Sequence, residues 1–96
     1  LDTLRVVGEF AGWERAKGVV MTRDADGRYV AEIPAPAGAD TVAYQISGVG
    51  MMARVAPLGA ERHVYHGMGQ WRAVARARDG KARVVFDPRE LVRDTT

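Results

Sequence analysis

The sequence predicts an all-β protein, an antiparallel β-sandwich of about seven short strands with the size of an immunoglobulin domain. Short apolar runs that alternate with polar residues recur along the chain, and turn-forming residues separate them at spacings of about 8–12 residues. No segment keeps a helical periodicity for more than about one turn. We therefore expect a single immunoglobulin-like domain over residues 1–91.

The clearest element is a β-hairpin over residues 71–88. Asp79-Gly80 separates two alternating runs, and this dipeptide favours a two-residue type I′ turn. With such a turn Arg78 lies opposite Lys81, and we expect the pairing to continue along both strands. One face is apolar and should join the core: Trp71, Ala73, Ala75, Ala77, Ala82, Val84 and Phe86. The other is mostly basic: Arg72, Arg76, Arg78, Lys81, Arg83 and Asp87, around Val74 and Val85.

The remaining strands follow from the same alternation. They are expected at Leu4–Glu9, Val19–Arg23, Arg28–Ile33, Val42–Ser47, Met51–Val55 and His63–His66. After the hairpin we expect a helical turn at Pro88–Leu91. Residues 92–96 are expected to be a tail or the start of a linker.

Composition restricts the class of protein. The 96 residues contain no cysteine, which excludes disulfides and thiolate metal sites, and no apolar run approaches the roughly 20 residues that cross a bilayer. We therefore expect no membrane insertion. The chain begins at Leu1, and Arg outnumbers Lys by 12 to 2 as in proteins of GC-rich genomes. These features suggest an accessory domain of a longer bacterial protein.

The sequence does not suggest an enzyme. No Ser-His-Asp arrangement is suggested by spacing, and no glycine-rich phosphate loop leads into a helix. His63 and His66 stand three residues apart, so on a strand they face opposite ways and should not share a metal. We expect neither a catalytic residue, nor a metal, nor a cofactor.

Four short runs carry a family resemblance. They are Gly8-Glu9-Phe10-Ala11-Gly12-Trp13, Met21-Thr22-Arg23, Asp26-Gly27-Arg28-Tyr29, and Pro34–Gly38 followed by Tyr44-Gln45-Ile46. In this order they resemble the glycogen-binding family of carbohydrate-binding modules. That family includes the sugar-binding domain of the AMP-activated kinase β subunit and the N-terminal domains of branching and debranching enzymes such as isoamylase. The resemblance covers a little over half of the chain, and it implies an early-set immunoglobulin-like fold and a non-catalytic α-glucan-binding role.

The resemblance also implies a ligand site. In sugar-binding members two tryptophans stack on the apolar faces of sugar rings, and a lysine bonds their hydroxyls. Trp13 matches the first tryptophan, whereas the lysine position falls on Gln45 and the second tryptophan on or near Met52. Trp13 would be the platform, Gln45 a hydrogen-bonding partner, and Met52 an adaptable wall without a flat face.

Three alternatives to sugar binding follow from the residues. Trp13 beside Phe10 also fits a structural role at the end of the sandwich. The same fold could act as a spacer, docking or dimerisation domain, with Met51, Met52 and Val55 as an apolar contact patch and the basic hairpin face meeting an acidic partner. Residues 49–96 hold 9 basic and 5 acidic side chains, a net charge of +4. Nucleic-acid binding ranks last, because no aromatic side chain is interleaved among these arginines for base stacking.

Overall fold

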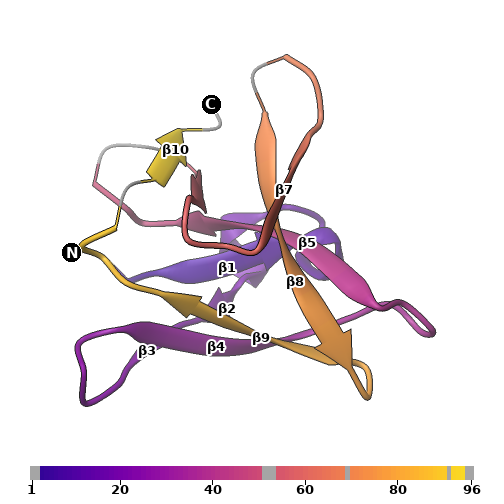
Figure 1. Ribbon diagram of the computed structural model, residues 1–96, viewed down its shortest axis with the longest axis horizontal. Coiled ribbons are helices and arrows are strands. Elements are labelled where there is room, and N and C mark those ends of the chain that lie inside the picture. Colours follow the sequence, from indigo (N-terminus) through magenta and orange to yellow (C-terminus); the bar gives the residue numbers. More distant parts are fainter. Residues whose placement is uncertain (1–2, 51–53, 69, 91, 95–96) are drawn as a thin grey trace.

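The protein is all-β with antiparallel strand pairing, as the sequence predicts (Figure 1). The structure is a computed structural model, and it describes residues 3–50, 54–68, 70–90 and 92–94. The strands within these ranges are β1 Arg5–Gly8, β2 Val19–Val20, β3 Thr22–Arg23, β4 Tyr29–Pro34, β5 Thr41–Ser47, β6 Val55–Pro57, β7 Arg62–Tyr65, β8 Trp71–Arg78, β9 Lys81–Phe86 and β10 Val92–Asp94. Two 3-10 turns, η1 Glu9–Ala11 and η2 Arg15–Lys17, follow β1.

The strands form two continuous layers that share β8. In one layer β1 pairs with β2 and β5, β5 with β6 and β8, β8 with β7, and β6 with β10. In the other layer β3 pairs with β4, and β4 with β9. The end of β8 pairs with β9 and closes the two layers into a nearly complete barrel. This architecture is compatible with a β-sandwich.

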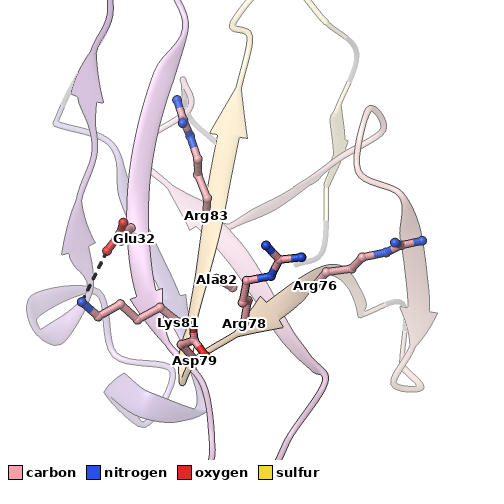
Figure 2. A pocket seen from close by; sticks show the side chains of 7 residues that line it. All are labelled: Glu32, Arg76, Arg78, Asp79, Lys81, Ala82 and Arg83. Atoms are coloured by element: carbon pink, nitrogen blue, oxygen red, sulfur yellow. Dashed lines mark ion pairs between the residues drawn. The ribbon is translucent and has the colours of Figure 1, made fainter.

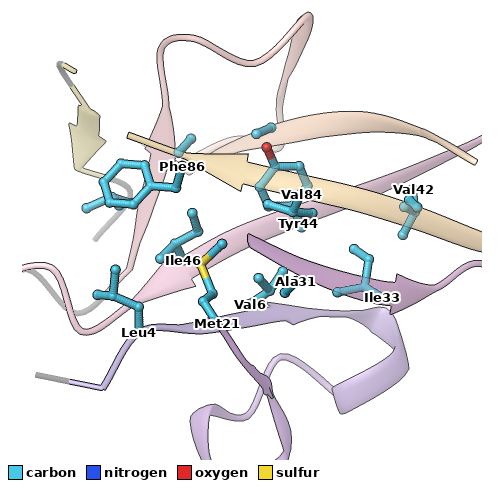
Figure 3. Packing of buried hydrophobic residues seen from close by; sticks show 14 residues of the cluster. Leu4, Val6, Met21, Ala31, Ile33, Val42, Tyr44, Ile46, Val84 and Phe86 are labelled. Carbon is cyan, nitrogen blue, oxygen red and sulfur yellow. The ribbon is translucent and has the colours of Figure 1, made fainter. Parts of the chain in front are cut away.

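The hydrophobic core lies between the layers, and every second residue of the central strands points into it (Figure 3). Strand β5 contributes Val42, Tyr44 and Ile46, and β9 contributes Val84 and Phe86. These are the inward positions that the sequence alternation predicts. Met21, between β2 and β3, also lies in the core, and its backbone N–H donates to the Leu4 carbonyl at 2.9 Å. The predicted strand Val19–Arg23 is therefore divided into two short strands.

The register of the β8–β9 hairpin is partly confirmed. Arg78 pairs with Lys81 and Ala77 with Ala82 around the Asp79-Gly80 turn, where both residues have positive φ. The predicted continuation of this pairing is wrong. Residues 73–76 of β8 pair with β5 and residues 71–74 with β7, whereas the whole of β9 pairs with β4. Each strand makes more backbone pairs elsewhere than the two pairs of the hairpin, yet the side chains of both keep the predicted alternation between faces.

The separation of β8 from β9 leaves Trp71 at the edge of the core and not inside it. The indole is only half-buried; it packs at the edge of the core, with its ring centroid 5.0 Å from that of Tyr65 and the two planes tilted by 51°. It therefore stands at the opposite end of β8 from the turn, against β7.

Only the end of the predicted strand Met51–Val55 is described: Arg54 lies outside a strand, whereas Val55 begins β6 and is fully buried. Met51–Ala53 lie outside the described residues. The prediction of a tail at residues 92–96 is wrong for the residues that the structure describes. Residues 92–94 form β10, which pairs with β6 through Val92 and Pro57, so these residues are part of the sheet and not a tail. The cause is long-range pairing, which the three-residue pattern of β10 does not reveal.

Val84 and Val85 provide a matched test of the core. They are neighbours on β9, but the exposed fraction of Val84 is 1 % and that of Val85 is 44 %. We expect Val84→Ala to lower the free energy of unfolding by about 2 kcal/mol, since it removes buried methyl groups and leaves a cavity. Val85→Ala should cost less than about 1 kcal/mol, as for a surface site. Urea unfolding measures both, and equal losses would contradict the assignment of faces.

The turn after β9 is held by an acidic side chain. The Asp87 carboxylate accepts hydrogen bonds from the Arg89 backbone N–H and from Arg89 Nε and Nη2, each at 2.9 Å. These bonds, foremost those from the side chain, lower the pKa of Asp87 from 3.8 to about 2. Because the folded-state pKa is depressed, the charged carboxylate stabilises the fold above about pH 4, and this contribution is lost as the pH falls towards 2.

We therefore expect the Asp87 carboxyl carbon to titrate near pH 2 in an NMR experiment on the folded protein. Arg89→Ala should raise this pKa towards the ordinary value. Arg28→Ala should raise it much less, because Arg28 Nε is 4.0 Å from the carboxylate and contributes least. A native Asp87 that titrates near 3.8 would show that the Arg89 contacts are not formed in solution.

Candidate functional site

The chain turns sharply after β1 and brings Trp13 over the outer face of the sheet. Gly12 and Trp13 both have left-handed backbone conformations, with φ of 59° and 61°, and the Trp13 N–H donates to the Gly8 carbonyl at 3.0 Å. Gly8 is required by close packing, since a Cβ there would lie 2.8 Å from Phe10 Cε1 and 3.0 Å from the Ala43 carbonyl oxygen. The Gly-x-Phe-x-x-Trp run is therefore a compact local structure whose last residue presents an indole ring.

Arg72 covers this indole ring. Its guanidinium carbon lies 4.0 Å from the centroid of the Trp13 ring, which is the geometry of a cation–π contact. Trp13 and Arg72 are both half-buried. Arg72 comes from the outer face of β8, 59 positions further along the chain than Trp13, and sequence reasoning placed it only among the basic residues of the hairpin. No local pattern links the two, so the contact depends on the three-dimensional pairing of β8 with β5.

Burial lowers the pKa of Arg72, and repulsion from Arg54 lowers it further, whereas Glu9 acts in the opposite direction. Arg72 Nε is buried and has no hydrogen-bond partner in the part of the chain that the structure describes. The guanidinium at the Trp13–Arg72 contact is thus partly desolvated and is influenced by a basic and an acidic neighbour. Because Nε is buried, an acceptor reaches it only if the Arg72 side chain moves.

Gln45 lies next to this contact but beneath the surface. Its Nε2 donates to the Trp71 carbonyl at 2.8 Å, while its Oε1 is buried and has no partner among the described residues. The exposed fraction of Gln45 is 1 %, so a ligand reaches the side chain only if the groups above it move. The structure therefore brings Trp13, Arg72 and Gln45 together in one region. Met52, the third predicted ligand residue, lies outside the described residues. The ligand roles of Trp13, Gln45 and Met52 stay predictions.

A second candidate region lies at the turn of the β8–β9 hairpin. A hollow of about 460 Å³ is lined there by four cationic side chains, two carboxylates and Ala82 (Figure 2). The cations are Arg76, Arg78, Lys81 and Arg83, and the carboxylates are Glu32 and Asp79. Lys81 Nζ is 3.8 Å from Glu32, and Arg76 Nε is 3.0 Å from Glu61 on the other side. Its four cations belong to the basic hairpin face that the sequence predicts, whereas Arg72 and Asp87 of that predicted face do not line the hollow.

The two histidines do not form a common site. His63 Nε2 is 2.7 Å from the Pro57 carbonyl oxygen, a contact that ties β7 to β6. Within residues 3–50, 54–68, 70–90 and 92–94, no group of three or more His, Asp or Glu side chains is arranged to hold a metal ion. In the same ranges, no helix is long and apolar enough to span a bilayer.

In comparisons with known proteins, no family model, no curated protein and no solved structure matched the chain. Candidate sites are therefore identified from the described residues themselves. Of these, the Trp13–Arg72 region combines an aromatic face, a guanidinium and unpaired buried polar atoms, and the hairpin hollow combines charge with concavity.

The Trp13–Arg72 contact can be tested by fluorescence quenching. In a Trp71→Phe background only Trp13 emits, and we expect Arg72→Ala to increase acrylamide quenching because it uncovers the ring. Arg76→Ala is the matched control, since Arg76 lies on the same strand and face but outside the contact. Equal quenching in all three proteins would show that Arg72 does not cover Trp13 in solution.

Proposed function

We propose that the protein is a non-catalytic carbohydrate-binding module whose ligand, an α-glucan or related oligosaccharide, binds at Trp13. The main support is the placement of the Trp13 indole on the outer face of the sheet, beside hydrogen-bonding groups from β5 and β8. The all-β architecture and the Gly8–Trp13 turn are both consistent with the family resemblance in the sequence.

The chemistry of the proposed site follows from two kinds of side chain. An indole offers a flat apolar surface that packs against the C–H groups of a pyranose ring, and a guanidinium offers several N–H donors for hydroxyl oxygens. In the proposed complex, Arg72 moves from the ring face to its rim as the sugar stacks. Its unpaired Nε–H is then one donor for a hydroxyl. Gln45 lies deeper and holds the backbone of β8 through the Trp71 carbonyl.

The second candidate function is a docking or dimerisation domain without sugar binding. The predicted contact patch of Met51, Met52 and Val55 does not support it, because Val55 is fully buried and the two methionines lie outside the described residues. A different observation favours it. The β7–β8 hairpin projects from the rest of the fold (Figure 1) and exposes Val64, Tyr65 and Met68, the last with an exposed fraction of 97 %.

Titration with maltoheptaose or β-cyclodextrin, followed by tryptophan fluorescence, tests the first candidate. We expect a saturable change in the Trp71→Phe protein, whose only indole is Trp13. Isothermal calorimetry then compares Trp13→Ala with the native chain. Since stacking on an aromatic ring contributes about 1–3 kcal/mol, loss of the ring should remove measurable affinity while the fold stays intact.

The control for this titration is Tyr65→Ala, which removes an exposed aromatic side chain of the β7–β8 hairpin that contacts Trp71 and not the Trp13–Arg72 pair. Its affinity for the sugar should equal that of the native protein. An affinity that Trp13→Ala leaves unchanged would contradict the assignment of Trp13. If the native protein shows no change up to millimolar sugar, the sugar proposal fails and the docking role is favoured.

A further inference from the structure

We propose that the hollow at the β8–β9 turn is an anion-binding surface that docks an extended acidic peptide segment. Its four cations outnumber its two carboxylates, which leaves a net charge of +2 in a concave site of about 460 Å³. This region lies at the opposite end of β8 from Arg72 and shares no side chain with the proposed sugar site. The inference is independent of the proposed function.

The ion pairs of the hollow leave cationic groups available. The side chains of Arg78 and Arg83 form no hydrogen bond or ion pair within the part of the chain that the structure describes. Lys81 is 3.8 Å from Glu32, and Arg76 meets Glu61 with both side chains more than 60 % exposed. Exposed ion pairs of this kind are worth little, so both can rearrange when a stronger partner arrives. Arg78 and Arg83 are the groups that carry the proposal.

The spacing of the cations matches an extended peptide. Arg76 and Arg78 stand two residues apart on β8, and Lys81 and Arg83 two residues apart on β9. Residues at this separation on a strand repeat at about 6.6 Å on one face. An extended segment with Asp or Glu at every second position repeats its carboxylates at the same distance. Each guanidinium can then bind one carboxylate through two parallel hydrogen bonds.

The composition of the hollow favours a peptide over single-stranded nucleic acid. Sites for single-stranded nucleic acid combine basic groups with aromatic side chains on which the bases stack. The side chains that line this hollow are charged or, at Ala82, small, and none is aromatic. The carboxylates of Glu32 and Asp79 would also repel a continuous phosphate backbone, whereas a peptide can place neutral residues beside them.

The test uses a fluorescein-labelled peptide of alternating Glu and Ala, ten residues long, and measures fluorescence anisotropy at low salt. We expect saturable binding that weakens as salt is added, because the contacts are exposed charges. Arg78→Glu with Arg83→Glu should weaken binding by about tenfold or more, since the variant replaces attraction by repulsion at the two unpaired guanidiniums. The neutral pair Arg78→Gln with Arg83→Gln should give a smaller loss.

The matched control is Arg15→Glu with Arg23→Glu, which makes the same change in net charge at two exposed arginines outside the hollow. Its affinity should stay within about twofold of the native value, as for a change that acts only through net charge at a distance. Circular dichroism confirms that both double variants are folded. An equal loss in the two double variants would mean unspecific charge attraction and would overturn the proposal.

Three other results would also overturn it. One is the absence of saturable binding at millimolar peptide. Another is equally tight binding of a peptide with its five Glu residues in one block, because the match of spacing would then be irrelevant. The third is displacement of the peptide by a single-stranded oligonucleotide at lower concentration than by unlabelled peptide, because the surface would then bind nucleic acid. The sugar titration at Trp13 is unaffected by any of these outcomes.

Discussion

The structure depends on one strand that belongs to two layers. β8 pairs with β5 and β7 over most of its length and with β9 only through Ala77 and Arg78. The tight Asp79-Gly80 turn fixes the start of β9, and β9 then pairs with β4 along its whole length. Without this shared strand, the two layers would be joined only by loops and core contacts. The inward alternation on β5, β8 and β9 can then enclose a single core.

The same strand arranges the two surface sites. The outer face of β8 carries Arg72 near its beginning, and Arg76 and Arg78 near its end. Arg72 meets Trp13, which the turn after β1 brings across the sheet. Arg78 faces the hollow that opens where β8 and β9 separate. A hairpin paired along its full length would have placed all of its basic residues on one flat face, so the separation of the strands makes two sites of different chemistry.

How much the sequence predicts depends on the range of the interaction concerned. The Asp79-Gly80 turn and its first two pairs follow from local backbone preferences, and the inward side chains of β5 follow from alternation. Strand β8 leaves β9 to pair with β5, and β10 pairs with β6. Both pairings join residues that are far apart in the sequence, so no local pattern predicts them. In the candidate site, Trp13 is predicted by the Gly8–Trp13 sequence motif. Arg72 could not be found, because only the tertiary pairing brings it to the ring.

The two sites also differ in how firmly they are built. Trp13 holds a left-handed backbone conformation, which costs a non-glycine residue about 1 kcal/mol or more, and buried atoms of Gln45 and Arg72 beside it lack partners among the described residues. Such costs persist only where the surrounding structure imposes the geometry, and they gather at sites that act on a ligand. In the hairpin hollow the left-handed residue is Asp79 of the turn, a residue type that tolerates this conformation, and the ion pairs are exposed and can rearrange. This difference fits the two proposals, which assign a rigid sugar ring to the first site and a flexible acidic peptide to the second.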